Sequence, residues 1–146
     1  LLTGENRVIA VDILHDVGRS LNPAVDMGQI EGGFIQGMGW LTTEELWWDT
    51  SGPLKTHAPS TYKIPTCSDR PEHFRMRIFE AGKNPEATIY RSKAVGEPPL
   101  MLCISALMAL SDAVAGAGGY TAYPALDAPA TPERVLMAVS RLEGRA

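Results

Sequence analysis

Cysteine is scarce in this sequence of 146 residues, which contains only Cys67 and Cys103. Neither cysteine belongs to a CxxC pair, and no cluster of histidines accompanies them. This spacing argues against a disulfide framework and against a zinc site. We therefore expect a protein of a reducing compartment, the cytoplasm.

Basic blocks and targeting segments are also missing. Lys and Arg number 13 against 17 Asp and Glu, and the net charge of −4 argues against a nucleic-acid partner. The first residues, Leu1–Gly4, show no initiator Met, no basic start and no cleavage site, so we expect a piece of a longer chain. The composition, 45% apolar and 21% charged, is that of an ordinary soluble domain.

Only one apolar run, Leu100–Ala115, approaches the length of a membrane helix. Its polar positions are Ser105, Ser111 and Asp112. The marginal length and the embedded Asp112 favour a buried helix of a large soluble domain over a membrane span.

The segment Ser92–Pro99, with the sequence SKAVGEPP, comes directly before this run. Gly96 permits turns that other residues rarely adopt, and Pro98 disfavours the α conformation at Glu97, so we expect Glu97 to be extended. Because proline is favoured in the first turn of a helix, the Glu97 carboxylate should lie just ahead of a helix N-terminus. Such a carboxylate is either a general base or a simple helix-start charge, and these residues alone leave both interpretations open.

Glycine is abundant in a second stretch, Asp26–Leu41. A helix is predicted there because apolar residues recur at helical spacing, namely Ile30, Phe34, Gly37, Met38 and Leu41. A second face carries amides and no bulk: Gln29, Gly32, Gly33 and Gln36. Each glycine costs about 1 kcal/mol in a helix relative to alanine, so the glycines indicate close approach either by other backbone or by a ligand.

Other interpretations of this glycine-rich helix are weaker. A transmembrane GxxxG face is excluded because polar residues interrupt a segment too short to span a bilayer. A Rossmann loop is excluded because GxGxxG is absent. Asp26 and Gln29 also have the spacing of a capping box.

Two strands are predicted: Arg7–Leu14, which is rich in β-branched residues, and Phe74–Phe79, which alternates strictly and should be half-buried. In the second, Arg75 and Arg77 are expected on the solvent face. A further short strand is predicted at Thr88–Arg91. A last helix should run from Pro132 to about Arg141, with Thr131 as its N-cap.

A hairpin is predicted around Asp49–Gly52, with one of Trp47 and Trp48 in the core and the other on the surface. The histidines suggest little chemistry. His15 beside Asp16 is most simply a polar strand end, and His57 and His73 are expected in loops or turns. A hydrolase that uses Glu97 with a histidine is disfavoured because no second carboxylate or nucleophile has motif spacing.

Five segments, spread over nearly the whole chain, resemble a known family in their order and sequence. They are Asp16–Trp40 (DVGRSLNPAVDMGQIEGGFIQGMGW), Glu44–Leu46 (EEL), Ala58–Thr66 (APSTYKIPT), Ser92–Leu100 (SKAVGEPPL) and Ala128–Glu133 (APATPE). Together they resemble the C-terminal part of the molybdopterin-binding subunit of xanthine dehydrogenases, which are molybdenum hydroxylases. The resemblance implies that residues 1–146 are a C-terminal fragment of a large molybdopterin-binding domain. Its α+β fold would pack mixed strands against the glycine-rich helix and a long buried helix.

The resemblance also implies roles for two residues. Glu97 matches the general base in the family's GEPP motif, and Gln29 matches a glutamine that contacts the molybdenum–molybdopterin cofactor. No residue of this chain is implied as a metal ligand. The implied reaction is hydroxylation of purines, hypoxanthine to xanthine to urate, in which Glu97 takes a proton from the attacking, water-derived oxygen. Electrons would pass through iron–sulfur clusters and FAD in other domains or subunits to NAD.

The implied partners are the remaining domains or subunits of such an enzyme: the iron–sulfur and FAD parts and the upstream molybdopterin-binding region, in an oligomeric complex. Two alternatives stay open. An aldehyde oxidase-type hydroxylase shares the glutamate, although the double proline after Glu97 and the sequence PSTYKIP favour the xanthine enzymes. The isolated chain could also be a non-catalytic packing or assembly module, because one base and one amide cannot hold a large cofactor unaided.

Overall fold

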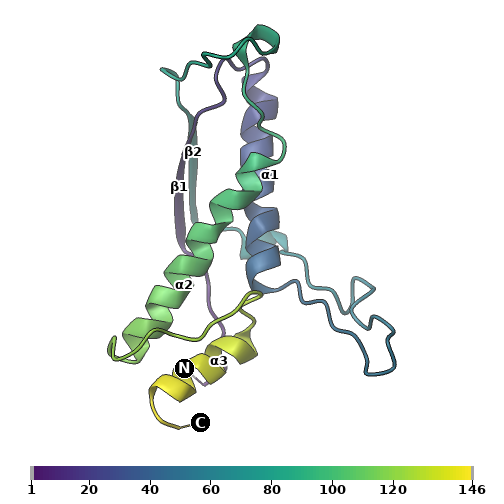
Figure 1. The fold of residues 1–146 in the computed structure, drawn as a ribbon, viewed down its shortest axis with the longest axis vertical. Helices are drawn as coiled ribbons and strands as arrows, with labels where there is room; N and C mark the ends of the chain where they lie inside the picture. Colours follow the sequence, from purple (N-terminus) through teal and green to yellow (C-terminus); the bar gives the residue numbers. More distant parts are fainter. Residues whose placement is uncertain (1, 146) are drawn as a thin grey trace.

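Between residues 2 and 145, which the computed structural model describes, the chain folds into two strands and three α-helices joined by long loops. The order is β1 (Ala10–His15), α1 (Pro23–Thr42), η1 (Cys67–Asp69), β2 (His73–Ile78), η2 (Ile89–Arg91), η3 (Pro98–Cys103), α2 (Ile104–Ala117) and α3 (Pro132–Leu142), where η marks a short 3-10 helix. Figure 1 shows α1 beside the strands, with α2 crossing alongside and α3 below. The expected α+β architecture is confirmed.

The strands β1 and β2 pair in parallel, from Ala10 opposite His73 to His15 opposite Ile78. Along both strands exposed and half-buried side chains alternate, as the period of two requires. On the exposed face, Arg75 Nε lies 2.7 Å from Asp12 Oδ1. The prediction of two strands, the second of them half-buried with exposed arginines, is confirmed.

Helix α1 is capped by Asn22, whose Oδ1 accepts a hydrogen bond from the Val25 backbone N–H at 3.4 Å. Pro23 follows in the first turn, where its missing N–H leaves no helical hydrogen bond unmade. The capping box predicted for Asp26 and Gln29 is wrong, because the helix has already begun before Asp26.

The main core lies between α1, the sheet and the start of α2. Its buried members are Phe34, Met38, Cys103 and Ala106, and half-buried side chains from both strands pack on them. The rings of Phe34 in α1 and Phe74 in β2 have centroids 5.6 Å apart and are tilted by 51°, a favourable arrangement for an aromatic pair. This core fixes which face of α1 meets the sheet and which faces remain for other contacts.

A second core joins α2 to α3, and its buried members are Val114, Ala130, Val135, Ala138 and Val139. The Thr131 hydroxyl caps α3 by accepting a hydrogen bond from the Arg134 backbone N–H at 3.4 Å. The predicted cap is therefore confirmed, and the helix ends at Leu142, close to the predicted Arg141.

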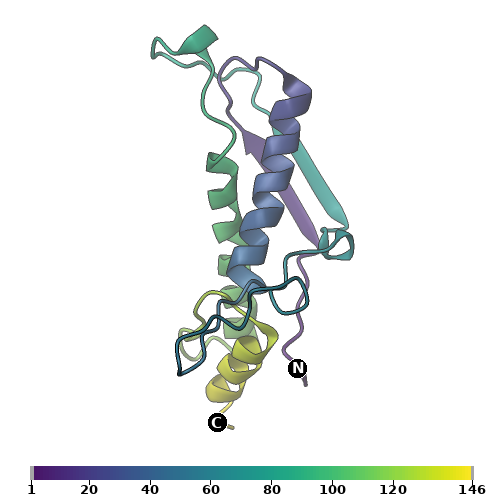
Figure 2. The ribbon, with the colours of Figure 1, turned by 90° about the vertical axis from the view of Figure 1, so that its right-hand side faces the viewer.

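The apolar segment Pro98–Ala117 is only partly covered by the rest of the chain. It forms η3 and then α2, which runs alongside α1 in Figure 2. Its mean hydropathy reaches 1.9 over an 18-residue window, of which 28% is buried. Length and composition would allow it to cross a membrane, but an apolar helix of a soluble domain passes the same test. The burial predicted for this helix is thus incomplete within the chain.

Two local predictions are wrong. The segment Thr88–Arg91, predicted as a strand, contains η2. Tyr90 and Arg91 there have positive φ angles of 49° and 62°, which no strand permits. His73, predicted as a turn residue, is the first residue of β2.

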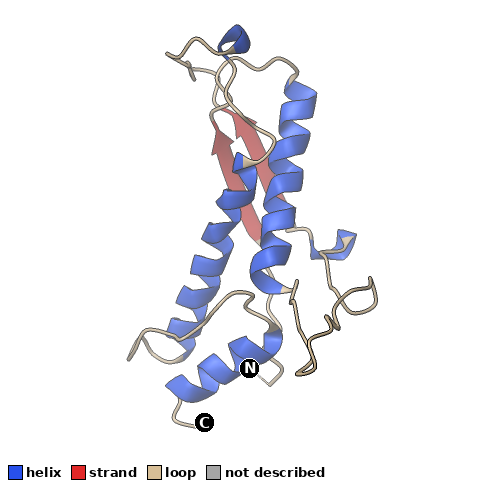
Figure 3. Cartoon of the chain, turned by 45° about the vertical axis from the view of Figure 1, so that its right-hand side comes forward, coloured by secondary structure: helices blue, strands red, loops and turns tan. Residues whose placement is uncertain are grey.

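The predicted hairpin consists of a turn and a single bridge, without assigned strands, in the long loop between α1 and β2, drawn in tan in Figure 3. Trp48 and Leu54 form an isolated antiparallel bridge, and the Gly52 N–H donates to Asp49 O at 2.8 Å. Trp47 and Trp48 are exposed by 56% and 54%, so the prediction that one of them lies in the core is wrong.

Candidate active-site face

The start of the segment Ser92–Pro99 is attached to the chain that follows β1. Gly18 and Ser92 form an antiparallel bridge. The backbone N–H of Lys93 donates to Val17 O at 2.9 Å, and Val17 is fully buried. The segment therefore leaves from a fixed point at the margin of the core.

An ion pair strengthens this attachment. Lys93 Nζ lies 2.5 Å from Asp16 Oδ2, while Asp16 Oδ1 accepts a hydrogen bond from the Gly18 N–H at 2.8 Å. The hydrogen bond from Lys93, followed by that from Gly18, holds the pKa of Asp16 below its ordinary value. The interpretation of His15 and Asp16 as a satisfied polar strand end is confirmed, since Asp16 is bonded to Lys93.

The far end of the segment is packed against two glycines of α1. A Cβ atom at Gly33 would lie 2.7 Å from Pro99 Cβ, and one at Gly37 would overlap Leu100 O. Pro99 is fully buried in this contact. These two glycines therefore serve close packing of backbone, which is one of the two alternatives that their abundance suggested.

Gly28 and Gly32 of α1 lie on an open face. Added Cβ atoms at Gly28 and Gly32 would meet no described atom within 4 Å. The Gln29 side chain between them is exposed, and its Oε1 lies 3.7 Å from the position of a Cβ added to Gly96. The structure thus places Gln29 beside the residue that precedes Glu97, next to unfilled space.

Glu97 occupies the N-cap position of η3 and is exposed. Its φ of −104° and ψ of −41° are in the α region, so the predicted extended conformation is wrong. The Leu100 N–H donates to Glu97 O at 3.1 Å, and this turn outweighs the local bias that Pro98 imposes. The Glu97 side chain makes no capping hydrogen bond to its own helix.

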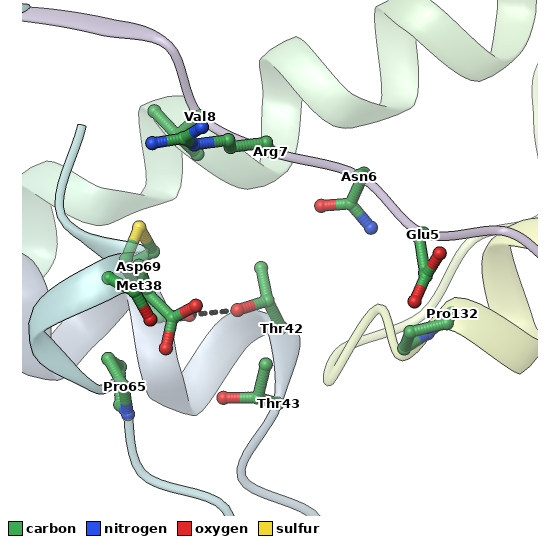
Figure 4. A pocket seen from close by; sticks show the side chains of 11 residues that line it. Glu5, Asn6, Arg7, Val8, Met38, Thr42, Thr43, Pro65, Asp69 and Pro132 are labelled. Atoms are coloured by element: carbon green, nitrogen blue, oxygen red, sulfur yellow. Dashed lines mark hydrogen bonds between the residues drawn. The ribbon is translucent and has the colours of Figure 1, made fainter. Parts of the chain in front are cut away.

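A cavity of about 300 Å³ lies near the other end of α1 (Figure 4). Met38 and Thr42 contribute to its lining, and the Thr42 hydroxyl donates to Met38 O at 2.6 Å. Neither Glu97 nor Gln29 lines this cavity. The two candidate residues are therefore exposed outside this cavity.

Sequence reasoning did not identify the Asp16–Lys93 pair. The two residues are 77 positions apart, and no local pattern links residues at that distance. The available signal was indirect, since each residue lies inside one of the segments that carry the resemblance.

Comparison with known proteins identifies the class. Residues 1–71 match the molybdopterin cofactor-binding domain family. The quinoline 2-oxidoreductase of Pseudomonas putida 86 superposes with a TM-score of 0.80 and 29% identity, over 92% of this chain and 16% of that one. The chain is thus part of the molybdopterin-binding portion of a molybdenum hydroxylase.

Within this class, the sequence matches the xanthine dehydrogenases. It is 47% identical to xanthine dehydrogenase of Oryza sativa subsp. japonica, over 94% of this chain and 11% of the relative. It is 50% identical to xanthine dehydrogenase/oxidase of Gallus gallus, over 92% of this chain and 10% of the relative. The chain corresponds to a segment of the molybdopterin-binding part of a xanthine dehydrogenase, and it spans about one tenth of the length of these relatives.

The open face of α1 fits a contact with the molybdopterin cofactor of this class. Gly28 and Gly32 leave room for close approach, because neither presents a Cβ atom and no described atom fills the space. Gln29 supplies an amide with both donors and an acceptor, which suits a ligand dense in nitrogen and oxygen atoms. Gln29 would be the residue of this face that contacts such a group, and the segment that carries Glu97 lies beside it at Gly96.

Proposed function

We propose that this chain supplies the general base, Glu97, to an enzyme that hydroxylates purines, converting hypoxanthine to xanthine and xanthine to urate. The observation that carries the proposal is that Glu97 is exposed between two anchored points, Lys93 and Pro99, while Gln29 lies beside its neighbour Gly96. The identity of 47% to 50% with plant and bird xanthine dehydrogenases supports the purine assignment over other substrates.

The chemistry divides between the cofactor and the protein. When bound, the molybdenum–molybdopterin group supplies the redox chemistry of the hydroxylation. Glu97 accepts a proton from the water-derived oxygen as that oxygen attacks the purine carbon, which requires an ionised carboxylate within hydrogen-bond reach. Gln29 orients the cofactor through its amide. Iron–sulfur clusters and FAD, held in other domains or subunits, would supply the path for electrons to NAD.

We place the whole enzyme in the cytoplasm, as an oligomeric complex in which this chain is the C-terminal part of the molybdopterin-binding region. Two unpaired cysteines, exposed Cys67 and buried Cys103, support a reducing compartment. The small share of its relatives that the chain covers supports further domains or subunits as partners.

Replacement of the base tests the proposal. In the complete enzyme, Glu97→Gln should lower kcat for xanthine by about 10²- to 10⁴-fold, since it removes general-base catalysis at nearly constant volume. The molybdenum content should stay unchanged. Glu86→Gln is the matched control, because Glu86 is an exposed acid in the preceding loop, and it should retain full activity. Near-normal turnover of the Glu97→Gln enzyme would exclude Glu97 as the base.

An aldehyde oxidase-type hydroxylase is the second candidate, because it shares the glutamate. The two functions separate in a substrate panel that compares kcat/KM for hypoxanthine and xanthine with kcat/KM for aromatic aldehydes. We expect the purines to be preferred by several orders of magnitude. A preference for the aldehydes would reverse the assignment while leaving the role of Glu97 intact.

A non-catalytic packing module remains the alternative for the chain in isolation. Its support is that Glu97 and Gln29 are exposed, as are Trp47 and Trp48. We expect the isolated chain to bind neither the cofactor nor purines. Stoichiometric molybdenum together with purine-dependent NAD reduction by the isolated chain would rule this alternative out.

A further inference from the structure

The segment that carries Glu97 is held at two points, and only one of them depends on side-chain charge. On the far side, Pro99 is buried against Gly33 of α1, a contact of apolar surface and backbone. On the near side, Lys93 makes a backbone hydrogen bond to Val17 and an ion pair with Asp16. Between these points only a few residues separate Lys93 from Glu97.

The ion pair between Lys93 and Asp16 has a defined geometry. The Lys93 ammonium and the Asp16 carboxylate are 2.5 Å apart, and their side chains are only 33% and 35% exposed. The second oxygen of Asp16 is occupied by the Gly18 N–H at 2.8 Å. A carboxylate with bonds on both oxygens cannot rotate away without losing one of them, so the pair fixes the Lys93 side chain as well as its backbone.

The pair also neutralises the positive charge of Lys93, which would otherwise be free near Glu97. A free ammonium four positions before Glu97 would attract the Glu97 carboxylate in competition with substrate. In the structure the Lys93 ammonium is bonded to Asp16 instead. Glu97 has no ion-pair partner among the salt bridges of the described residues.

We propose that Asp16 and Lys93 are positioning residues that hold the Glu97 segment in register with α1 and touch neither substrate nor cofactor. This inference rests on the proposed function of Glu97 as the base. Geometry of this kind matters because a displacement of about 1 Å at a catalytic group can lower the rate about 10²-fold.

The test is a double-mutant cycle in the complete enzyme. Lys93→Met keeps the length of the side chain and removes the charge, and it should lower kcat for xanthine by about 10- to 100-fold with KM and molybdenum content little changed. Lys93→Arg should restore most of this loss, because a guanidinium can still reach Asp16. Asp16→Asn should resemble Lys93→Met.

The cycle is completed by Lys93→Met combined with Glu97→Gln. Because the pair acts only through Glu97, the double variant should be no slower than Glu97→Gln alone. Multiplicative losses would show that Lys93 acts independently, and a Lys93→Met enzyme with wild-type kcat would equally overturn the proposal. The two failures are distinguishable. If the Glu97→Gln enzyme is active, the assignment of Glu97 as the base fails. If the Glu97→Gln enzyme is impaired while the Lys93→Met enzyme is unaffected, only the positioning role is overturned.

Two controls address general destabilisation. Lys83→Met removes an exposed lysine in the same region, and Arg75→Met removes the exposed ion pair with Asp12 on the outer face of the sheet. Both should leave kcat unchanged. A loss in these controls equal to that of Lys93→Met would show that the effect is not specific to the Glu97 segment, and would overturn the proposal.

Discussion

At the scale of single residues, exposure separates the groups that can meet a ligand from those that hold the core. Glu97 and Gln29 are both exposed. Cys103, only six positions beyond Glu97, is fully buried beneath α1. The change within a few residues follows from the helix that begins at Pro98, which turns Pro99 and Cys103 inward.

The contact proposed for Gln29 predicts a loss of cofactor when the amide is removed. Gln29→Ala should weaken retention of molybdenum by about 2- to 10-fold, the range expected for one lost hydrogen bond. The matched control is Gln36→Ala, which removes an exposed amide farther along the same helix face. Metal analysis of both purified enzymes checks the prediction. Equal molybdenum content in the two variants would contradict the role of Gln29.

Burial predicts the reactivity of Cys103. Burial raises the pKa of this thiol to about 12, so it stays protonated and unreactive at pH 8. Because the folded pKa lies above the unfolded value, the folded state is favoured at lower pH and loses stability as the pH rises beyond about 9. Peptide mapping after iodoacetamide treatment should find Cys103 unmodified in the native enzyme and modified in guanidinium. Rapid native labelling would show that the α1–η3 contact opens readily.

At the scale of elements, α1 is the part of the chain that links the site to the core. One face packs Phe34 and Met38 into the core. A second face, through Gly33 and Gly37, receives η3 in close contact, and a third carries Gln29 beside open space. Backbone packing thus explains Gly33 and Gly37, while Gly28 and Gly32 leave open space that the proposed cofactor contact would use.

These two requirements predict opposite effects of adding a methyl group to neighbouring positions. Gly33→Ala should destabilise the enzyme by about 1–3 kcal/mol, because its Cβ would press on Pro99, which is buried and cannot move freely. Gly32→Ala should be tolerated, with up to about 1 kcal/mol gained from helix propensity, yet it should lower molybdenum content if the cofactor fills the open space. Thermal unfolding and metal analysis of both variants separate the effects. The prediction fails if the two substitutions behave alike.

Local sequence patterns were sufficient to predict several helices and strands. They were insufficient where a contact with other residues determines the backbone conformation. Alternation in Phe74–Phe79 predicted β2, and the Thr131–Pro132 pair predicted the start of α3, because both signals act within a few residues. The conformation of Glu97 was wrong, since the turn to Leu100 opposes the local preference before proline. The role proposed for Glu97 rests on the resemblance, because one sequence shows a carboxylate but not what binds it.

At the scale of the whole molecule, large apolar side chains are exposed in two places. Trp47 and Trp48 lie on the projecting loop, while Met101, Ile104 and Met108 form a stripe at helical spacing along η3 and α2. Exposed patches of this kind mark interfaces in soluble proteins. The relatives supply about nine tenths of their length outside the region that this chain matches, which is ample to cover them.

This arrangement predicts that one substitution has opposite consequences in two contexts. In the isolated chain, Ile104→Lys should reduce self-association and dye binding at apolar surface, because a charge interrupts the exposed stripe. In the complete enzyme the same lysine would be buried without a partner, so assembly and molybdenum content should fall. Ser51→Lys serves as a control at an exposed polar position of the loop, with little effect expected in either context. Sedimentation of the isolated chain and yield of the complete enzyme measure the two outcomes. If Ile104→Lys were harmless in the complete enzyme, the stripe would face solvent there and the interface would have to lie elsewhere.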